Sequence, residues 1–411
     1  MAGNPGMDVE VRYKVESVYG TPVTGAGGEM LRCHAGSGLS MARSPIEDPE
    51  IRSDRMESMM RLGGKSVAGT YPGTLSVGTF NTFLGALFRH AWAAAAPAIT
   101  CDAGAVYTSL ATTVTNTLTL VGTGSFLTQG VRVGDVVRLS AMGAGVDNIN
   151  AVVATVAANS LTVLGAPWAN ITADTNAVLT ICKKLRPALG TIADPVVESS
   201  YTCEEYFETI DESEQYAGCR VSSMKLTFTP TGVVKVEFGM VGQTVAILAA
   251  GASAPGLTTP TEYTSVGLIA ADATIYVAGT AIATVTGGEV TFDLSAQGIE
   301  VVGSLVTPDV WTGKMKVRGQ ITAVRTLLTG SHLARYIAET DNVEMSLMFV
   351  EPDAAAPIDF VHLFIPRIKY TGDTKNWGNE GPVVETIPFM AAAKATTTGY
   401  DAVTATISTS A

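Results

Sequence analysis

Residues 221–241 have the sequence VSSMKLTFTPTGVVKVEFGMV, in which polar and apolar side chains alternate on both sides of Pro230-Thr231-Gly232. Alternation with a period of two predicts strands, and the Pro-Thr-Gly step between them predicts a hairpin turn. Further short runs rich in Val and Thr, bounded by Gly, Asn or Pro, occur along the chain. The sequence therefore predicts a mainly β fold.

The chain has 411 residues, 46% of them hydrophobic and 16% charged, with a formal net charge of −12. This length predicts two or three domains, and the hydrophobic share excludes an intrinsically disordered chain. Five cysteines, spread singly, exclude a disulfide scaffold and a zinc ribbon. The excess of Asp and Glu over Lys and Arg argues against a protein that binds nucleic acid. Because residues 1–16 lack the features of a signal peptide and no apolar stretch is long enough to span a membrane, we expect a soluble protein made in a cytoplasm.

Two strand-then-helix units lie about 250 residues apart. The first predicts a helix over 80–88 with Thr79 as N-cap, and the second predicts a helix over 332–338 with Ser331 as N-cap. Antiparallel strands follow each helix, so the order of elements indicates an internal duplication. The predicted parts are a first β domain at 1–95 and 186–250, a linker at 251–262, a second β domain at 263–390 and an extended or loosely ordered C-terminal tail at 391–411.

A segment of different character interrupts the first β domain at residues 96–185, which we name the insert. It is poor in charge and contains five short runs typical of strands, near 117–121, 133–140, 150–157, 160–164 and 177–182. Five short strands in about 90 residues predict a small closed barrel of the SH3 or OB type, carried on the outside of the molecule.

The sequence contains no set of residues suited to catalysis or metal binding. Gly63-Gly64-Lys65-Ser66 ends like a phosphate-binding loop, but Met59 stands where the required glycine would be. The four histidines, at 34, 90, 332 and 362, are isolated, and none is four residues from another His or near a Cys with metal-ligand spacing. We therefore expect no enzyme activity and no cofactor.

Two charged segments are candidates for contact with other molecules. The segment from Arg43 to Lys65, which we name the arm, mixes both signs and carries three Met; balanced charge with Met favours a protein partner. Its charged residues are Arg43, Glu47, Asp48, Glu50, Arg52, Asp54, Arg55, Glu57, Arg61 and Lys65. The alternative for the arm is a solvated loop.

The second segment, EEYFETIDESE, is wholly acidic in its charges and is named the acidic run. Its carboxylates are Glu204, Glu205, Glu208, Asp211, Glu212 and Glu214. They are interpreted either as a solvated hairpin face or as a surface that faces a polyanion without binding it. A calcium site is a weaker alternative, because the regular spacing of calcium ligands is missing.

The motifs around the arm resemble those of the tail tube proteins of long-tailed, non-contractile bacteriophages. They are Ser37-Gly38-Leu39, Ile51-Arg52-Ser53-Asp54-Arg55, Gly64-Lys65-Ser66-Val67-Ala68-Gly69, Leu75-Ser76 and Phe80-Asn81-Thr82-Phe83-Leu84. Residues 130–137, GVRVGDVV, are similar to the small barrel inserted in many members of that family. Val317-Arg318-Gly319 and Ile365-Pro366-Arg367-Ile368-Lys369-Tyr370 extend the likeness over nearly all of residues 10–390.

The resemblance implies a fold of two tail-tube β-sandwiches, each with a flanking helix, plus the inserted small barrel. It also implies a virion protein, assembled in the bacterial cytoplasm, whose inner sheets join those of neighbouring subunits around a lumen. The arm would contact the next ring, and the tube would meet the tape measure protein and the tail tip and terminator proteins. DNA would pass through without specific binding, so we expect a negatively charged lining, with part of the acidic run as candidate.

A duplicated chain implies a ring of three subunits; without duplication the ring would hold six. Two other functions are compatible with the sequence. One is the inner tube of a contractile tail or secretion machine, which shares the fold. The other, from a different class, is a β-rich surface adhesin or carbohydrate-binding protein, for which a secretion signal and aromatic platforms would be expected.

Overall fold

The computed structural model describes the chain except for residues 1–4, 37, 52, 55, 57–58, 94–97, 103–104, 144, 250, 252–253, 327–330, 341–342, 352–356, 379, 395–403 and 411. Strands make up 51% of the protein and helices 6%. The mainly β fold that the alternating runs predict is therefore confirmed.

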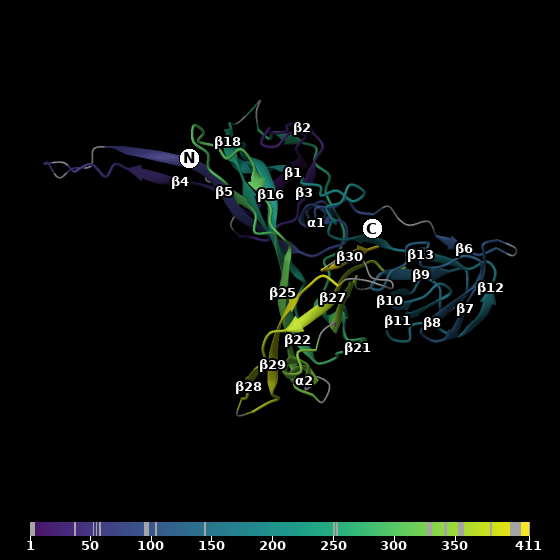
Figure 1. Ribbon diagram of the computed structural model, residues 1–411. Coiled ribbons are helices and arrows are strands. Elements are labelled where there is room, and N and C mark those ends of the chain that lie inside the picture. The colour runs from purple at the N-terminus through teal and green to yellow at the C-terminus, as the bar shows by residue number, and fades with distance from the viewer. Residues whose placement is uncertain are drawn as a thin grey trace.

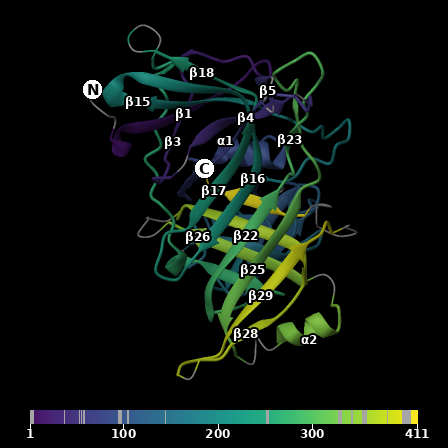
Figure 2. The same cartoon turned by 90° about the vertical axis from the view of Figure 1, so that its left-hand side faces the viewer.

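A long antiparallel sheet passes through the whole molecule, and its central strands lie side by side in Figure 2. In spatial order, its strands are β4 (Leu39–Glu47), β5 (Met60–Thr74), β17 (Lys235–Gly242), β16 (Glu212–Phe228), β22 (Val285–Asp293), β25 (Lys316–Val324) and β29 (Val384–Ala391). At the far end β29 also pairs with the end of β27 (Phe360–Tyr370) and with β28 (Thr374–Asn376). The hairpin predicted at 221–241 is the β16–β17 pair of this long sheet.

The N-terminal parts of β16 and β27 belong to two shorter sheets. The first contains β3 (Glu29–Leu31), β1 (Val9–Val15), β15 (Tyr201–Phe207), β16 and β18 (Thr244–Leu248). The second contains β21 (Thr280–Ala281), β20 (Thr274–Val277), β26 (Val343–Val350), β27, β30 (Thr406–Thr409) and β14 (Lys183–Leu185). Residues buried from the long sheet and from both shorter sheets form one continuous core.

Helix α1 (Asn81–Phe88) lies in the core of the first half and has no exposed residue. The ring of Phe83 is 4.4 Å from that of Tyr13 in the first shorter sheet and 5.5 Å from that of Phe238 in the long sheet. The helix thus holds the two layers together through large aromatic contacts. The expected N-cap at Thr79 is wrong: the helix begins at Asn81, and the Thr79 hydroxyl is instead 2.7 Å from that of Ser76.

Helix α2 (Ser331–Ile337) lies in the second half, near β27. Unlike α1 it presents side chains to solvent, with Tyr336 and Ile337 exposed. His332 on its buried side is 2.9 Å from the Tyr370 hydroxyl, measured from Nδ1.

The insert forms a separate body with its own core, beside the rest of the molecule (Figure 1). In spatial order its strands are β12 (Ile171–Asp174), β7 (Tyr107–Val114), β8 (Thr117–Gly122), β11 (Ser160–Val163), β10 (Asn150–Val156), β9 (Val136–Ser140), β13 (Val178–Ile181) and β6 (Ile99–Thr100). The sequence predicted five strands. Among the described residues β12 and β6 are the unpaired ends of this sheet, so its pairings do not close a barrel.

The insert follows α1 in the sequence, but it packs against the second half of the chain. Val136 and Val152 of the insert form a buried cluster with Met348 and Phe360. Beside it, the Asn150 side-chain amide donates to the Ile358 carbonyl oxygen at 2.7 Å. These contacts connect the two halves through the insert.

The remaining elements of the described chain are short. They are two short strand pairs, β2 (Gly25–Ala26) with β19 (Leu257–Thr258) and β23 (Gln297–Gly298) with β24 (Val310–Trp311), and three single-turn helices at Gly6–Asp8, Glu208–Ile210 and Ala270–Asp272. Leu257, in the segment predicted as a linker, is fully buried. The C-terminal segment was expected to be an extended or loosely ordered tail; residues 406–409 are extended, and they form the buried strand β30 between β27 and β14.

Candidate assembly surfaces

The arm is a two-stranded hairpin rather than an irregular loop over most of its length. β4 and β5 pair from Leu39 opposite Gly69 to Glu47 opposite Met60, and they project away from the rest of the molecule (Figure 1). Cross-strand pairs stabilise such a hairpin, but two strands without a core are only marginally stable in water, so contacts at the base matter for its shape.

The charged residues of the arm have different positions along the hairpin. Arg43 faces Lys65 near the base, and its guanidinium donates to the carbonyl oxygens of Gly63 (3.0 Å) and Leu62 (3.2 Å). Glu47 and Arg61 are on the outer part, whereas Asp48, Glu50 and Asp54 surround the tip. Arg52, Arg55 and Glu57 lie outside the described residues.

Apolar side chains are exposed along the outer part of the arm. Ile51 is 99% exposed and Met60 is 86% exposed, and further exposed side chains are Ile46, Met56, Met59 and Leu62. Exposed apolar groups concentrated on a projecting hairpin are typical of a surface that contacts another protein. Met adapts its shape to such contacts.

The base of the arm is supported by the second half of the chain. The backbone N–H of Lys65 donates to the Leu305 carbonyl oxygen at 2.8 Å, and Lys65 forms a parallel bridge with Val306. Leu305 and Val306 belong to the segment that connects β22 with β25, just as the outer part of the arm connects β4 with β5. The direction of the arm is therefore set by both halves.

Two members of the acidic run, Glu204 and Glu205, are not on the surface, which corrects their assignment to an acidic surface. Glu204 is fully buried and accepts the N–H groups of Gly256 and Leu257, each at 2.6 Å. Glu205 accepts the Leu39 N–H (2.7 Å) and the Tyr71 hydroxyl (3.1 Å), and burial raises the pKa of its carboxyl. Successive strand residues point to opposite faces, and here one face is covered by the linker and the other by β4 and β5.

The other carboxylates of the run surround the turn between β15 and β16. Asp211 accepts the Tyr206 hydroxyl (3.1 Å) and the Gly251 N–H (2.8 Å), and Glu214 accepts the Tyr216 hydroxyl (2.5 Å). Glu208 is exposed and Glu212 is half-buried. The acidic surface therefore consists of Glu208, Asp211, Glu212 and Glu214. Of these, Asp211 and Glu214 also accept hydrogen bonds from neighbouring residues of the same chain.

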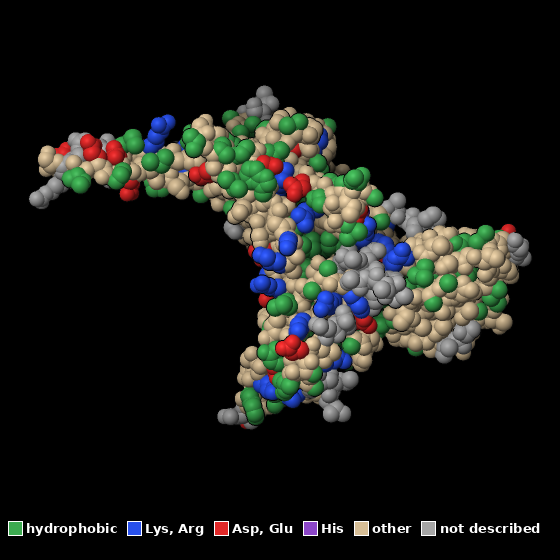
Figure 3. Space-filling model, viewed as in Figure 1, with side chains coloured by type: hydrophobic (Ala, Val, Ile, Leu, Met, Phe, Trp, Pro, Cys, Tyr) green, Lys and Arg blue, Asp and Glu red, His purple; other side chains and the backbone are tan. Residues whose placement is uncertain are grey.

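The long sheet presents one face to the core, while the described elements leave its other face open; this open face is turned to the viewer in Figure 2. Its charged side chains are Lys225, Lys235, Glu237, Glu289, Asp293, Lys316, Arg318 and Lys369. Lys225 Nζ and Glu289 Oε2 are 2.9 Å apart, and Figure 3 shows Lys and Arg side chains along the concave side of the molecule. Lys and Arg outnumber Asp and Glu on the open face, and the acidic run does not contribute to it.

This face was not predicted, although the sequence contains a signal for it. In the two quoted strands Lys225, Thr227, Lys235 and Glu237 are the polar members of the alternation. The sequence alone could not show that β22 and β25 continue the same face.

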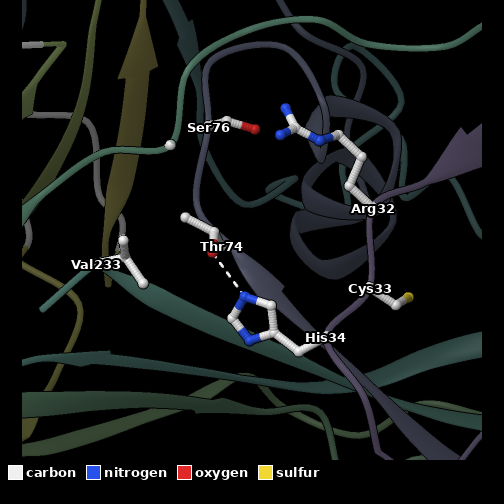
Figure 4. Close-up of a pocket in the computed structure, with 7 residues that line it drawn as sticks. Arg32, Cys33, His34, Thr74, Ser76 and Val233 are labelled. Carbon is white, nitrogen blue, oxygen red and sulfur yellow. Dashed lines mark hydrogen bonds between the residues drawn. The ribbon is translucent and has the colours of Figure 1, made fainter. Parts of the chain in front are cut away.

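A pocket of about 350 Å³ is lined by residues 32–34, Thr74, Ser76, Val233 and Gly267, and Figure 4 shows this lining. His34 Nε2 is 2.6 Å from the Thr74 hydroxyl, while Arg32 donates to the Ser265 carbonyl oxygen at 2.5 Å. Burial raises the pKa of the Cys33 thiol to about 12, and the thiol points away from the His34 ring. The polar side chains His34, Thr74 and Arg32 of this pocket are therefore engaged in hydrogen bonds within the protein, which indicates a structural role.

Among the described residues no cluster of three or more His, Cys, Asp or Glu side chains could hold a metal ion. The same part of the chain contains no helix long and apolar enough to cross a membrane.

An exposed arm with apolar side chains and an open sheet face are typical of a structural β protein that contacts other protein chains. A family model described as phage tail tube protein matches residues 6–408. The chain therefore belongs to the phage tail tube protein family, a structural family of the virion whose members assemble into a tube, and not an enzyme family. No curated protein was found to match the chain.

Proposed function

We propose that this chain is the repeating subunit of the tail tube of a long-tailed, non-contractile phage. In this proposal subunits form rings, the rings stack, and the channel guides genome DNA into the host. The single observation that carries the proposal is the long sheet, which joins two similar halves edge to edge and, among the described residues, ends in β4 on one side and β28 on the other.

The internal duplication is supported by equivalent pairings in the two halves. In the first half β4 pairs with β5, helix α1 follows, and β5 pairs with β17. In the second half β22 pairs with β25, helix α2 follows, and β25 pairs with β29. The shorter sheets match as well, since β1–β15–β16 corresponds to β20–β26–β27.

Two glycines support the same equivalence at atomic detail. Gly69 of β5 faces Leu39, and a Cβ added to it would lie 2.4 Å from the Gly38 carbonyl oxygen. Gly319 of β25 faces Val290, and a Cβ there would lie 2.4 Å from the Glu289 carbonyl oxygen. Glycine is required at both places because the neighbouring strand comes so close.

With two equivalent halves in each chain, three chains supply six similar units to a ring. We propose this ring of three over a ring of six chains. The open face would line the channel, because a sheet that is covered on one side only must turn the other side to water. On this assignment the lining has more Lys and Arg than Asp and Glu and is rich in Ser and Thr, rather than negative as the sequence predicted. The three acidic side chains of the face offset part of the positive charge that would hold the phosphates of passing DNA.

The arm, in this proposal, contacts a subunit of the adjacent ring through its exposed Met and Ile side chains. The tube would enclose the tape measure protein, end at tip and terminator proteins, and assemble in the cytoplasm of the host bacterium. These partners follow from the resemblance of the motifs.

Negative-stain electron microscopy of the purified protein tests the proposal. We expect stacked rings with a central channel and three-fold symmetry. Six-fold symmetry would overturn the ring of three, and monomers that never form rings, even with tail tip complexes added as nuclei, would overturn the tube assignment. In virions, a contracting sheath around the tube would favour the contractile alternative.

A further inference from the structure

Helix α1 lies at the contact between the two halves, where the second half covers it. The ring of Phe88 is 5.7 Å from that of Phe292 in β22. Leu84 lines a small cavity together with side chains of β26, β27 and β30, which are Phe349, Val361, Leu363 and Ile407. The second half thus completes the burial of α1, which has no exposed residue.

Helix α2 has an equivalent place in the second half but keeps one face in water. It begins as many residues after Gly319 as α1 begins after Gly69. Its residues Tyr336 and Ile337 are 41% and 74% exposed. Figure 2 shows α2 at the same end of the molecule as β28. An apolar helix face that stays exposed is typical of a contact with another chain.

A bulge that occurs in both halves locates the surface on the first half that corresponds to the cover of α1. In β16 one extra residue follows Tyr216 before pairing with β15 resumes at Cys219. In β27 one extra residue likewise follows Ile365 before pairing with β26 resumes at Ile368. Because a bulge fixes the register of its strand, positions on either side of it can be matched one by one.

The residues that cover α1 therefore have counterparts on the first half. Glu214 of β16 faces Ile247 of β18, just as Leu363 of β27 faces Ile407 of β30. Strand β4 matches β22 through the residues that face the two matching glycines. In order, Phe292, Phe349, Leu363 and Ile407 correspond to Met41, Phe207, Glu214 and Ile247.

These four counterparts form a surface that is open to solvent, which we name the docking face. Ile247 is 66% exposed and Met41 is 40% exposed, whereas Ile407 and Phe292 are buried. Phe207 and Glu214 are half-buried. Figure 2 shows β4 and β18 at one end of the molecule and α2 at the other, so the two exposed surfaces can meet head to tail in neighbouring copies.

The two surfaces also have complementary charge. Glu212 and Glu214 make the docking face acidic, and no Lys or Arg stands between Tyr201 and Cys219. Helix α2 contains Arg335 and no acidic residue. Opposite charges favour the approach of α2 to the docking face.

We propose that α2 of one copy of this chain packs on the docking face of the next copy in the ring. The inference rests on the proposed function, because it takes a ring of duplicated chains as given and names the partner of α2 in it. The exposed face of α2 is then covered by β4, β15, β16 and β18 of the next copy, as α1 is covered by β22, β26, β27 and β30 within one chain. The two surfaces differ, so the contact repeats from copy to copy until the ring closes.

Single charged substitutions in the full-length protein test the contact from both sides. Ile337 is the most exposed apolar side chain of α2, and Ile247 has this place on the docking face. Ile337→Asp and Ile247→Asp should each raise the protein concentration needed for ring formation at least tenfold, measured by sedimentation velocity. The melting temperature of the unassembled chain should stay unchanged, because both side chains are exposed there.

Val121→Asp is the matched control, since it places the same charge on a side chain of the insert that is 50% exposed. It should form rings at the native concentration. Rings from Ile337→Asp at the native concentration would overturn the inference.

A pair of double variants tests whether the two surfaces touch each other. The opposite-charge variant I247K/I337D should form rings at a concentration at least fivefold lower than the like-charge variant I247D/I337D. Equal concentrations for the two variants would overturn the inference and leave the proposed function intact, as long as the native chain forms rings. A native chain that forms no rings, even with tail tip complexes added, would overturn the proposed function itself.

Discussion

Arg220 in the first half and Asp309 in the second are joined by a salt bridge, with 2.9 Å between Nη2 and Oδ1. The same guanidinium donates through Nη1 to Glu198 Oε2 (2.6 Å) and to the Val310 carbonyl oxygen (2.5 Å). It also lies over the ring of Tyr19, 4.9 Å from its centroid. Arg220 is buried, so it connects the two halves through a desolvated charge.

Replacing Arg220 by Met is expected to lower the free energy of unfolding by about 2–3 kcal/mol, because two carboxylates and a carbonyl lose a buried charged donor. Urea unfolding of the unassembled subunit measures this. Lys225→Met, which breaks the exposed Lys225–Glu289 pair, is the matched control and should cost less than about 1 kcal/mol. A loss at Arg220 no greater than that at Lys225 would contradict its role as a connection between the halves.

Alanine at either Gly69 or Gly319 should destabilise the protein by a similar amount, about 3 kcal/mol. The added Cβ would meet backbone carbonyl oxygens at 2.4 Å in both cases, and the backbone of a paired strand cannot move away without loss of hydrogen bonds. Thermal unfolding of both variants provides the comparison. Gly6→Ala, where the added Cβ meets no atom within 4 Å, is the neutral control. Large loss at one glycine and none at the other would contradict the equivalence of the two halves.

Local sequence patterns predicted the elements whose secondary structure and buried face depend mainly on their own residues. The alternation in 221–241 indicated the β16–β17 hairpin, and the apolar face of the first helix indicated its burial, with Phe83, Leu84, Leu87 and Phe88 in the core. The N-cap was misplaced because Thr79 binds Ser76 instead of capping the helix.

Features set by distant parts of the chain could not be predicted in this way. Glu204 looks like a surface residue in an acidic run, yet it is buried because Gly256 and Leu257 return to cover it. The docking of the insert depends on Met348 and Phe360, about 200 residues further on. Strand β30 has Thr or Ser at three of its four positions, a composition typical of a tail, and is buried because β14 and β27 enclose it and Ile407 joins the core.

The outer part of the arm should tolerate charge in the free subunit but not in the tube. Ile51→Asp combined with Met60→Asp alters two exposed side chains, so the free energy of unfolding should change by less than about 0.5 kcal/mol. If the arm buries both residues against the next ring, stacking should need at least about tenfold more protein, since burial of each is worth about 1.5 kcal/mol or more. Sedimentation of tubes measures this.

Val106→Asp, at an exposed position of the insert, is the matched control and should leave tube formation unchanged. Tubes that form equally well from the arm variant would exclude the arm as the stacking contact.

Acid is expected to destabilise the second half through its buried histidines. Burial lowers the pKa of His362 from 6.5 to about 3, and burial together with Arg335 lowers that of His332 to about 4. The folded protein keeps both rings neutral, whereas the unfolded chain binds protons below pH 6.5. Stability is therefore present above pH 6.5 and is lost as pH falls toward the folded pKa values, by about 2 kcal/mol for each histidine between pH 7 and pH 5.

His362→Gln removes one of these protonation sites while an amide remains to bond the Ser346 hydroxyl, which is 2.8 Å from Nε2 in the native protein. The variant should lose about 2 kcal/mol less than the native chain between pH 7 and pH 5, because its unfolded state no longer gains that proton. Urea unfolding of the unassembled subunit at the two pH values gives the difference, in which the contribution of the carboxylates cancels. Ser346→Ala is the control, since it removes the hydrogen bond and retains the histidine: it should be weaker at both pH values with the native pH dependence. An unchanged pH dependence in His362→Gln would show that His362 is not a source of the acid lability.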